Sequence, residues 1–272
     1  MTENFAPLLS RIAEALERIA PPPPADADPM AHPAYIWADG RLAAVAAFNP
    51  QPLDLLEGIE AQKQAVMRNT RRIANGLPAH DVLLWGSRGM GKSSVVKSAV
   101  GALQAEGLPI ALIEVARDAL PSLPQLFSRI RGLDRHFVLF ADDLSFEGDY
   151  TAAKTLRSLL EGGAEARPEN ARLYVTSNRR HLVDRDLKEQ DSAINQRDVV
   201  DDKLALADRF GLSLGFHNCD QETYLAMVRG YARQAGVPFD EHDALQWAVT
   251  RGSRSGRVAW HYAQEIMARA RE

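Results

Sequence analysis

Residues 86–94 read Gly86-Ser87-Arg88-Gly89-Met90-Gly91-Lys92-Ser93-Ser94. The spacing is that of a complete phosphate-binding loop, G-x-x-x-x-G-K-[ST], set between an apolar run at residues 82–85 and a helical pattern that begins at Lys92. Glycines let backbone N–H groups turn toward phosphates, and the N-terminus of the following helix adds its positive dipole end. We therefore expect a nucleoside-triphosphate site in which Lys92 reaches the β- and γ-phosphates and Ser93 ligates Mg²⁺.

The composition bounds the class of protein. With 272 residues the chain is long enough for one large or two modest domains. A formal net charge of −4 offers no overall basic field for nucleic acid, although local basic patches stay open. Cys219 is the only cysteine, so an intrachain disulfide and a Cys₄ or Cys₂His₂ zinc site are excluded. The N-terminus resembles no signal peptide and no apolar stretch is membrane-length, so we expect a cytoplasmic protein without a membrane partner.

Apolar, strand-like runs alternate with helical patterns through the middle of the chain. The runs lie at residues 110–115, 137–141, 173–176 and 212–216. A helical pattern at residues 92–104 lies between the run at 82–85 and the first of these, and another at residues 152–160 separates the second from the third. Such alternation predicts a parallel, doubly wound α/β sheet with helices on both faces.

Different patterns flank this core. Apolar residues at helical spacing (Leu8, Leu9, Ile12, Leu16 and Ile19) end at four prolines, which predicts an N-terminal helix at 1–20 and a Pro-rich linker with an irregular segment at 21–52. The helix would either pack on the main body or a partner subunit, or serve as a docking peptide. We assign residues 53–218 to the nucleotide-binding domain and 219–272, with three helical blocks, to a small all-helical lid. Asp220 would cap the first lid helix and Gly236 would end it.

A pair of carboxylates follows the second of these strands. Residues 137–141 are apolar and Asp142-Asp143 come directly after them. A buried parallel strand delivers such residues to the carboxyl edge of the sheet, where doubly wound folds bind ligands. Asp142 would hold a hydrated Mg²⁺, and Asp143 would orient or deprotonate the attacking water.

Three further polar residues stand where a triphosphate site would use them. Asn178 follows the strand-like residues 173–176, and its amide can contact a water or a γ-phosphate oxygen, although a turn-forming role is the alternative. Arg209, beside Phe210, offers a planar fork for phosphate, or else pairs with Asp208 at the surface. Arg257 falls in the first turn of the last helix, where the helix dipole disfavours a cation and a bound polyphosphate would relieve the conflict.

Together these motifs resemble those of the AAA+ ATPases, with residues 86–93 as Walker A, 137–143 as Walker B, Asn178 as sensor 1, Arg209 as arginine finger and Arg257 as sensor 2. The helical tail resembles the AAA+ lid. More narrowly, about residues 53–263 resemble the bacterial AAA+ family known as domain of unknown function 815. The phrases that carry this likeness are Gly58-Ile59, Gln62-Lys63, Asn69-Thr70, Leu83-Leu84-Trp85-Gly86, Asp142-Asp143-Leu144-Ser145-Phe146, residues 176–182 and residues 251–258.

The resemblance implies a P-loop NTPase of the AAA+ type that binds ATP or ADP with Mg²⁺, forms a nucleotide-dependent homo-oligomer and couples hydrolysis to remodelling of an unknown partner. Ser93 and Asp142 would hold the metal, and Ile59 and Arg257 would join the loop in binding nucleotide. The implied nucleotide-binding loop residues are Gly86, Ser87, Arg88, Gly89, Met90, Gly91, Lys92, Ser93 and Ser94. The implied catalytic residues are Lys92, Asp143, Asn178 and Arg209.

Departures from the AAA+ pattern keep two other functions open. Asp143 stands where most AAA+ proteins have Glu, which places the carboxylate one methylene nearer the backbone and would slow hydrolysis. One alternative is therefore a nucleotide-gated binding module, and the other a DNA-remodelling or helicase-loading factor. Residues 116–124 lack the aromatic-apolar-Gly loop of peptide-threading machines. The charged residues 179–208 are either a solvated loop or a recognition insert.

Overall fold

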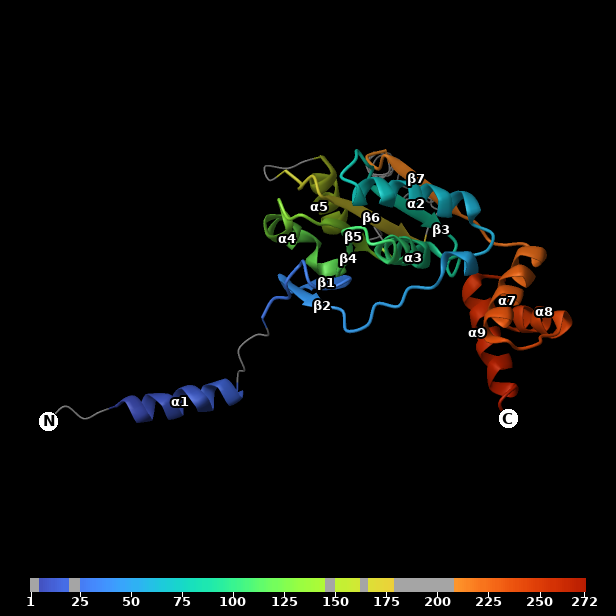
Figure 1. The fold of residues 1–272 in the computed structure, drawn as a ribbon, viewed down its shortest axis with the longest axis horizontal. Helices are drawn as coiled ribbons and strands as arrows, with labels where there is room; N and C mark the ends of the chain where they lie inside the picture. The colour runs from blue at the N-terminus through green and yellow to red at the C-terminus, as the bar shows by residue number, and fades with distance from the viewer. Residues whose placement is uncertain (1–4, 20–24, 145–149, 162–165, 179–207) are drawn as a thin grey trace, which may run out of the picture.

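The computed structural model describes residues 5–19, 25–144, 150–161, 166–178 and 208–272. A seven-stranded sheet forms the centre of the body, with strands in the order β2-β1-β4-β5-β6-β3-β7 (Figure 1). Every neighbouring pair is parallel except the β1–β2 hairpin. The strands are β1 (Ala34–Ala38), β2 (Arg41–Ala44), β3 (Val82–Gly86), β4 (Ile110–Val115), β5 (His136–Ala141), β6 (Ala171–Ser177) and β7 (Leu212–Phe216).

Helices cover both faces of this sheet because its strands are apolar on both sides. Alternate residues of one strand enter different cores, so that Leu84 packs on one face of the sheet and Leu83 packs on the other. The first face is covered by α2 (Glu60–Ala74) and α3 (Lys92–Ala105). The second is covered by the 3₁₀ helix η2 (Arg117–Ser122), α4 (Leu123–Ile130) and α5 (Tyr150–Glu161). The predicted doubly wound α/β fold is confirmed.

The C-terminal helices form a separate layer next to the body (Figure 1). They are α7 (Gln221–Ala235), α8 (Glu241–Thr250) and α9 (Gly256–Arg269). The Asp220 side chain accepts from the Thr223 N–H at 2.8 Å at the start of α7, and Gly236 ends that helix with a φ of 68°. Both predicted caps are therefore present. The buried rings of Tyr224 and Tyr262 hold the three helices together.

The expectation of a linker and irregular segment over residues 21–52 is wrong for residues 34–44. These residues form the β1–β2 hairpin, and β1 adds to the sheet beside β4. Tyr35 and Trp37 are fully buried, and the hairpin turns at Asp39 and Gly40 with φ values of 52° and 68°. An Asp-Gly pair with both φ angles positive is a type I′ hairpin signal, so the sequence did contain the evidence for this element.

Helix α1 (Ala6–Ile19), near the N-terminus, lies apart from the body (Figure 1). Its apolar residues Leu8, Leu9 and Ile12 are exposed. The predicted helix is present. In this structure the helix does not pack on the main body of its own chain. Packing on a partner subunit and a docking role stay predictions.

A buried polar cluster ties α2 to β6 and to the chain before β3. The Asn69 side-chain amide donates to the Tyr174 hydroxyl at 2.9 Å and to the His80 carbonyl at 2.8 Å, and its oxygen accepts from the His80 N–H at 3.0 Å. The Thr70 hydroxyl also lies 2.9 Å from that of Tyr174. Burial raises the pKa of Tyr174 to about 12, so the ring stays neutral and the cluster keeps its hydrogen bonds over the physiological pH range.

We predict that Asn69→Ala lowers the free energy of unfolding by about 2–3 kcal/mol, because it removes one partner of the buried Tyr174 hydroxyl and the side-chain partner of both backbone groups of His80. Asn75→Ala is the matched control, since Asn75 is exposed and bonds only to the Arg71 carbonyl one turn earlier in its own helix. We expect this control to change stability by about 0.5 kcal/mol or less. Urea denaturation measures both, and equal losses would contradict a special role for the cluster.

Candidate nucleotide-binding site

A cavity of about 490 Å³ opens at the carboxyl edge of the sheet. The phosphate-binding loop after β3, the ends of β5 and β6, the chain before α2, and the lid helices α7 and α9 all line it. Doubly wound folds bind ligands at this edge, because parallel strands bring their terminal residues together there.

The loop begins where β3 runs closest to β7. Gly86 has a φ of 120°, and a Cβ on it would lie 2.0 Å from the Phe216 carbonyl oxygen. No other residue fits this position without moving β7. Ser87 secures the contact by donating its N–H to the same carbonyl at 2.8 Å. At the far end of the loop, Gly91 has a φ of 87° and starts α3.

Lys92 is buried within the loop that it follows. Its ammonium donates to the carbonyls of Gly86 and Ser87, both at 2.8 Å, and to the Asn178 amide oxygen at 3.2 Å. Burial lowers the pKa of Lys92 to about 8, although the nearby Asp142 and Asp143 oppose the shift. The ammonium therefore sits among neutral oxygens, in a place where a phosphate would supply the opposite charge.

Two oxygen groups suited to Mg²⁺ meet beside the loop. The Ser93 hydroxyl donates to Asp142 Oδ1 at 2.7 Å, and the Thr176 hydroxyl donates to the same oxygen at 2.5 Å. Mg²⁺ prefers one or two carboxylate or hydroxyl ligands together with water and phosphate oxygens, so the donor set fits. The described residues offer no cluster of three or more His, Cys, Asp or Glu side chains for a metal held by protein alone.

Asp143 and Asn178 are joined directly. The Asn178 amide nitrogen donates to the Asp143 carboxylate, while its oxygen accepts from Lys92. Asp143 has a φ of 50°, in the left-handed region, and its N–H donates to the Thr176 hydroxyl at 2.7 Å. A non-glycine residue in this conformation is uncommon and is held by its surroundings. Asn178 thus fixes the direction of the carboxylate, which is exposed to the cavity.

The lid places α9 directly on the loop. The Arg257 N–H donates to the Gly89 carbonyl at 3.2 Å, and the Ser255 side chain caps α9 by accepting from Val258. Arg257 and Arg88 line the cavity, and their charges further lower the pKa of Lys92. Within the part of the chain that the structure describes, neither arginine has a carboxylate partner. Three cations therefore surround one end of the cavity.

The cavity lining also has an apolar part, of which only Ile59 and Met90 were expected from the sequence. Ile59 lies at the start of α2, and its Cδ1 is 3.3 Å from where a Cβ on Gly91 would stand. Tyr231 and Trp260 pack edge to face with ring centroids 5.2 Å apart. The lining residues that sequence reasoning missed are Gln51, Leu55, Leu56, Glu57, Thr176, Met227, Tyr231, Gly256 and Trp260. The apolar residues among them are typical of a protein core, so no local signal distinguishes them.

Arg209 lies away from this cavity. It precedes β7, whose residue Leu212 pairs with Val82 at the amino end of β3, whereas the phosphate-binding loop follows the carboxyl end. The five residues of β7, at about 3.3 Å each, separate the two places. Phe210 is buried and anchors the turn. The structure brings together every other predicted site residue named above around the cavity, apart from Gly86 and Ser87.

Solved structures with a similar fold include the Holliday junction branch migration motor RuvB from Thermotoga maritima and the ORC1 protein of Aeropyrum pernix in complex with DNA. RuvB is 18% identical with a TM-score of 0.52, and the match covers 80% of this chain and 64% of RuvB. ORC1 is 15% identical with a TM-score of 0.55, and the match covers 79% of this chain and 62% of ORC1. This chain therefore spans less than two thirds of either protein. The likeness establishes the AAA+ fold.

A search of curated proteins finds none that matches the chain. The sequence pattern of one family, described as "Protein of unknown function (DUF815)", matches residues 30–270. That range includes the whole sheet, the cavity and all three lid helices. The chain belongs to this family, and its fold is that of the AAA+ ATPases.

Proposed function

We propose that the protein is a Mg²⁺-dependent ATPase of the AAA+ type. One observation carries the proposal: a buried lysine, a serine–aspartate pair suited to Mg²⁺, and an aspartate directed by an asparagine all line a single cavity. Binding alone needs only the first two. The third, Asp143 with Asn178, is the arrangement that water activation requires.

Each residue then has a role in phosphoryl transfer to water. Bound Mg²⁺, held by Ser93 and Asp142, would neutralise charge on the β- and γ-phosphate oxygens. Lys92 exchanges its carbonyl partners for phosphate oxygens. The Asp143 carboxylate would accept a hydrogen bond from the attacking water and take its proton as the new oxygen–phosphorus bond forms. The bond from the γ-phosphorus to the β–γ bridging oxygen would break in the same step, so that ADP leaves with that oxygen and inorganic phosphate is the second product. Asn178, which bonds to that carboxylate and to Lys92, would hold the carboxylate in position and contact the γ-phosphate.

The apolar part of the cavity fits a purine base. Leu55, Leu56 and Met227 could make apolar contacts with the faces of the base, and Tyr231 and Gln51 provide polar groups in the same cavity. We favour ATP over GTP because the sequence has no guanine-reading Asn-Lys-x-Asp motif. Since the base would touch both α7 and the chain before α2, the nucleotide would link the lid to the body.

We further propose that hydrolysis needs a homo-oligomer. Arg209 stands at the opposite edge of the sheet from its own loop, about the length of β7 away, so it reaches a γ-phosphate only in a neighbouring subunit. In other phosphoryl-transfer enzymes an arginine supplied in this way adds about 10³-fold or more to turnover. Assembly would then couple the nucleotide state to remodelling of a protein partner, in the cytoplasm.

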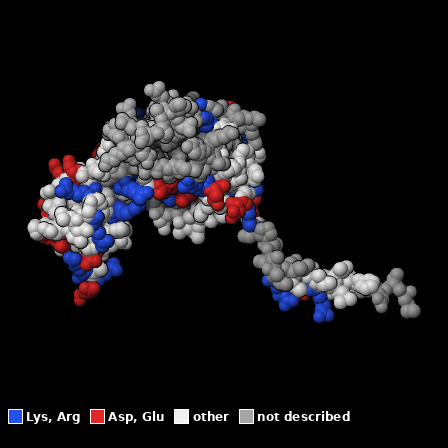
Figure 2. All heavy atoms as spheres, turned by 180° about the vertical axis from the view of Figure 1, so that it is seen from behind, with Lys and Arg blue, Asp and Glu red and all other residues white. Residues whose placement is uncertain are grey.

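A DNA-directed role is the second candidate, since RuvB is a branch migration motor and ORC1 was solved with DNA. The charge distribution favours it less. Acidic and basic side chains are interspersed on the face shown in Figure 2, and the chain as a whole carries a charge of −4.

No helix among the described residues is both long and apolar enough to span a membrane.

We predict that Lys92→Ala abolishes ATP binding, whereas Asp143→Asn binds ATP normally and no longer hydrolyses it. Lys92 contacts phosphate in the ground state, and Asp143 acts mainly on the water in the transition state. Calorimetric titration and phosphate release measure the two effects. Equal losses of ATP affinity in both variants would contradict the assigned roles.

We predict that Arg257→Ala weakens ATP binding more than ADP binding, because the γ-phosphate supplies the additional charge that this arginine meets. Arg254→Ala is the control, since Arg254 is exposed in the same turn but does not line the cavity. The ratio of the two dissociation constants is the readout. A ratio equal to that of the wild type would remove Arg257 from the site.

We predict that Arg209→Ala still binds ATP but is nearly inactive, and that mixing it with Lys92→Ala restores part of the activity. Mixed interfaces pair an intact loop with an intact arginine. Wild-type specific activity should also rise with protein concentration. A mixture that stays inactive, together with specific activity that is flat on dilution to the monomer, would show that Arg209 does not act between subunits.

A further inference from the structure

Helix α1 presents an apolar stripe to solvent. Phe5, Leu8, Leu9 and Ile12 follow the i, i+3, i+4, i+7 spacing of one helix face, and their exposed fractions are 58%, 54%, 63% and 54%. Figure 1 shows the helix clear of the body. A contiguous exposed stripe of this kind marks an interaction surface, because leaving it in water has a cost that a partner would remove.

The stripe is held at a short distance from the body. Ala27 donates its N–H to the Leu42 carbonyl at 2.8 Å, and Arg135 donates to the Pro29 carbonyl at 2.9 Å, so the chain is fixed to the body before β1. Residues 20–24, four of them proline, connect this fixed part to α1. At the roughly 3.1 Å per residue that is typical of proline-rich sequence, five residues span at most about 15 Å, and the 14-residue helix adds about 21 Å. The stripe is therefore available to neighbouring molecules in an assembly.

The described surface of the body has no matching apolar area. Its exposed large apolar residues are Met30, Ile36, Leu77 and Val249, which lie before β1, on β1, after α2 and on α8. A lipid surface also fits poorly. Helices that lie on membranes are rich in Lys and Arg, whereas α1 has two Arg and two Glu residues.

We propose that the apolar face of α1 packs against α1 of a second copy of this chain. An identical helix supplies a stripe of the same length and width. The polar side has both charge signs, with Arg11 and Arg18 near Glu14, so two copies approach without net repulsion, and Figure 2 shows the basic side chains gathered on one side of the helix. The proposal rests on the homo-oligomer proposed above.

The size of the stripe explains why the bodies must assemble first. A stable interface between free proteins buries about 800 Å² on each partner, more than four side chains of one short helix provide. Once subunits are held together by their bodies, the tether keeps the helices at a local concentration in the millimolar range. Pairing of α1 then adds stability to an existing oligomer and does not create one from monomers.

Two adjacent residues, one beside the apolar stripe and one on the polar side of the helix, provide the test. Ala15 lies seven residues after Leu8, beside the stripe, whereas Glu14 lies on the polar side, where it accepts from the Ser10 hydroxyl. Ala15→Cys and Glu14→Cys are each made with Cys219→Ser, so that each chain has one thiol. The full chain is treated with a short bismaleimide, with and without a non-hydrolysable ATP analogue, and its mass in solution is measured in parallel.

We expect cross-linked dimers from Ala15→Cys at about tenfold or more the yield from Glu14→Cys, because tethered helices meet through one face. Adding Leu9→Glu and Ile12→Glu should abolish the cross-link and leave ATP binding unchanged. Equal yields from the two cysteines in a sample that is oligomeric by mass would overturn the α1 pairing alone. So would binding of α1 to anionic vesicles in place of cross-linking. A sample that is monomeric at every nucleotide state would overturn the proposed assembly itself.

Discussion

The site depends on the close approach of two backbones, Gly86 at the end of β3 and Phe216 at the end of β7. A Cβ at Gly86 would enter the Phe216 carbonyl, and Ser87 donates to that same carbonyl, so the loop starts from a fixed point on the neighbouring strand. The contact also determines where the lid begins, because α7 starts five residues after Phe216. The lid helix α9 then meets the loop through Arg257 and Gly89. The close pairing of β3 with β7, the position of the loop and the position of the lid thus all depend on Gly86, which has no side chain.

Much of this arrangement was predictable, for identifiable physical reasons. Strands buried on both faces appear in the sequence as continuous apolar runs, and the phosphate-binding loop has a spacing that few other structures require. Because parallel strands end at the same edge, Asp142 and Asn178 were expected near Lys92, and the structure places them there. Caps such as Asp220 are local, so they too are legible in the sequence.

Other features arise only from tertiary packing. Leu55, Tyr231 and Trp260 look like core residues of three helical segments, and nothing local indicates that they share a cavity. The β1–β2 hairpin was missed because the preceding prolines suggested an irregular chain, although Asp39-Gly40 signals a turn. The contact between Asn178 and Asp143 depends on the left-handed conformation of Asp143, which its sequence does not specify. The roles of the site residues themselves stay predictions until nucleotide binding and hydrolysis are measured.

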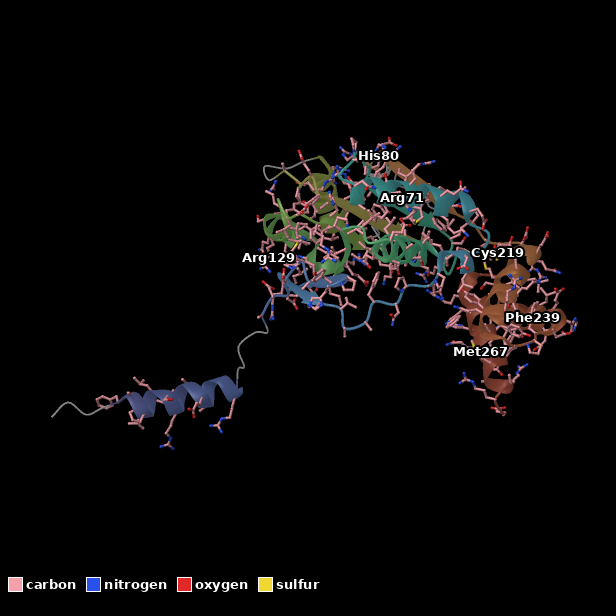
Figure 3. All side chains as sticks on the ribbon, in the orientation of Figure 1. Arg71, His80, Arg129, Cys219, Phe239 and Met267 are labelled. Atoms are coloured by element: carbon pink, nitrogen blue, oxygen red, sulfur yellow. The ribbon has the colours of Figure 1, made fainter. Side chains whose placement is uncertain are left out.

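The junction between body and lid holds the only thiol of the chain, at Cys219, three residues after β7 ends (Figure 3). The side chain is half-buried, and burial raises the pKa of its thiol, so it is a slow nucleophile in this structure. Swinging the lid away would hydrate the sulfur and return its reactivity toward that of a free cysteine. The rate of alkylation of Cys219 would then report how often the lid moves away from the body. Because the chain has no other cysteine, comparing this rate with ATP and with ADP would measure lid movement without any added label.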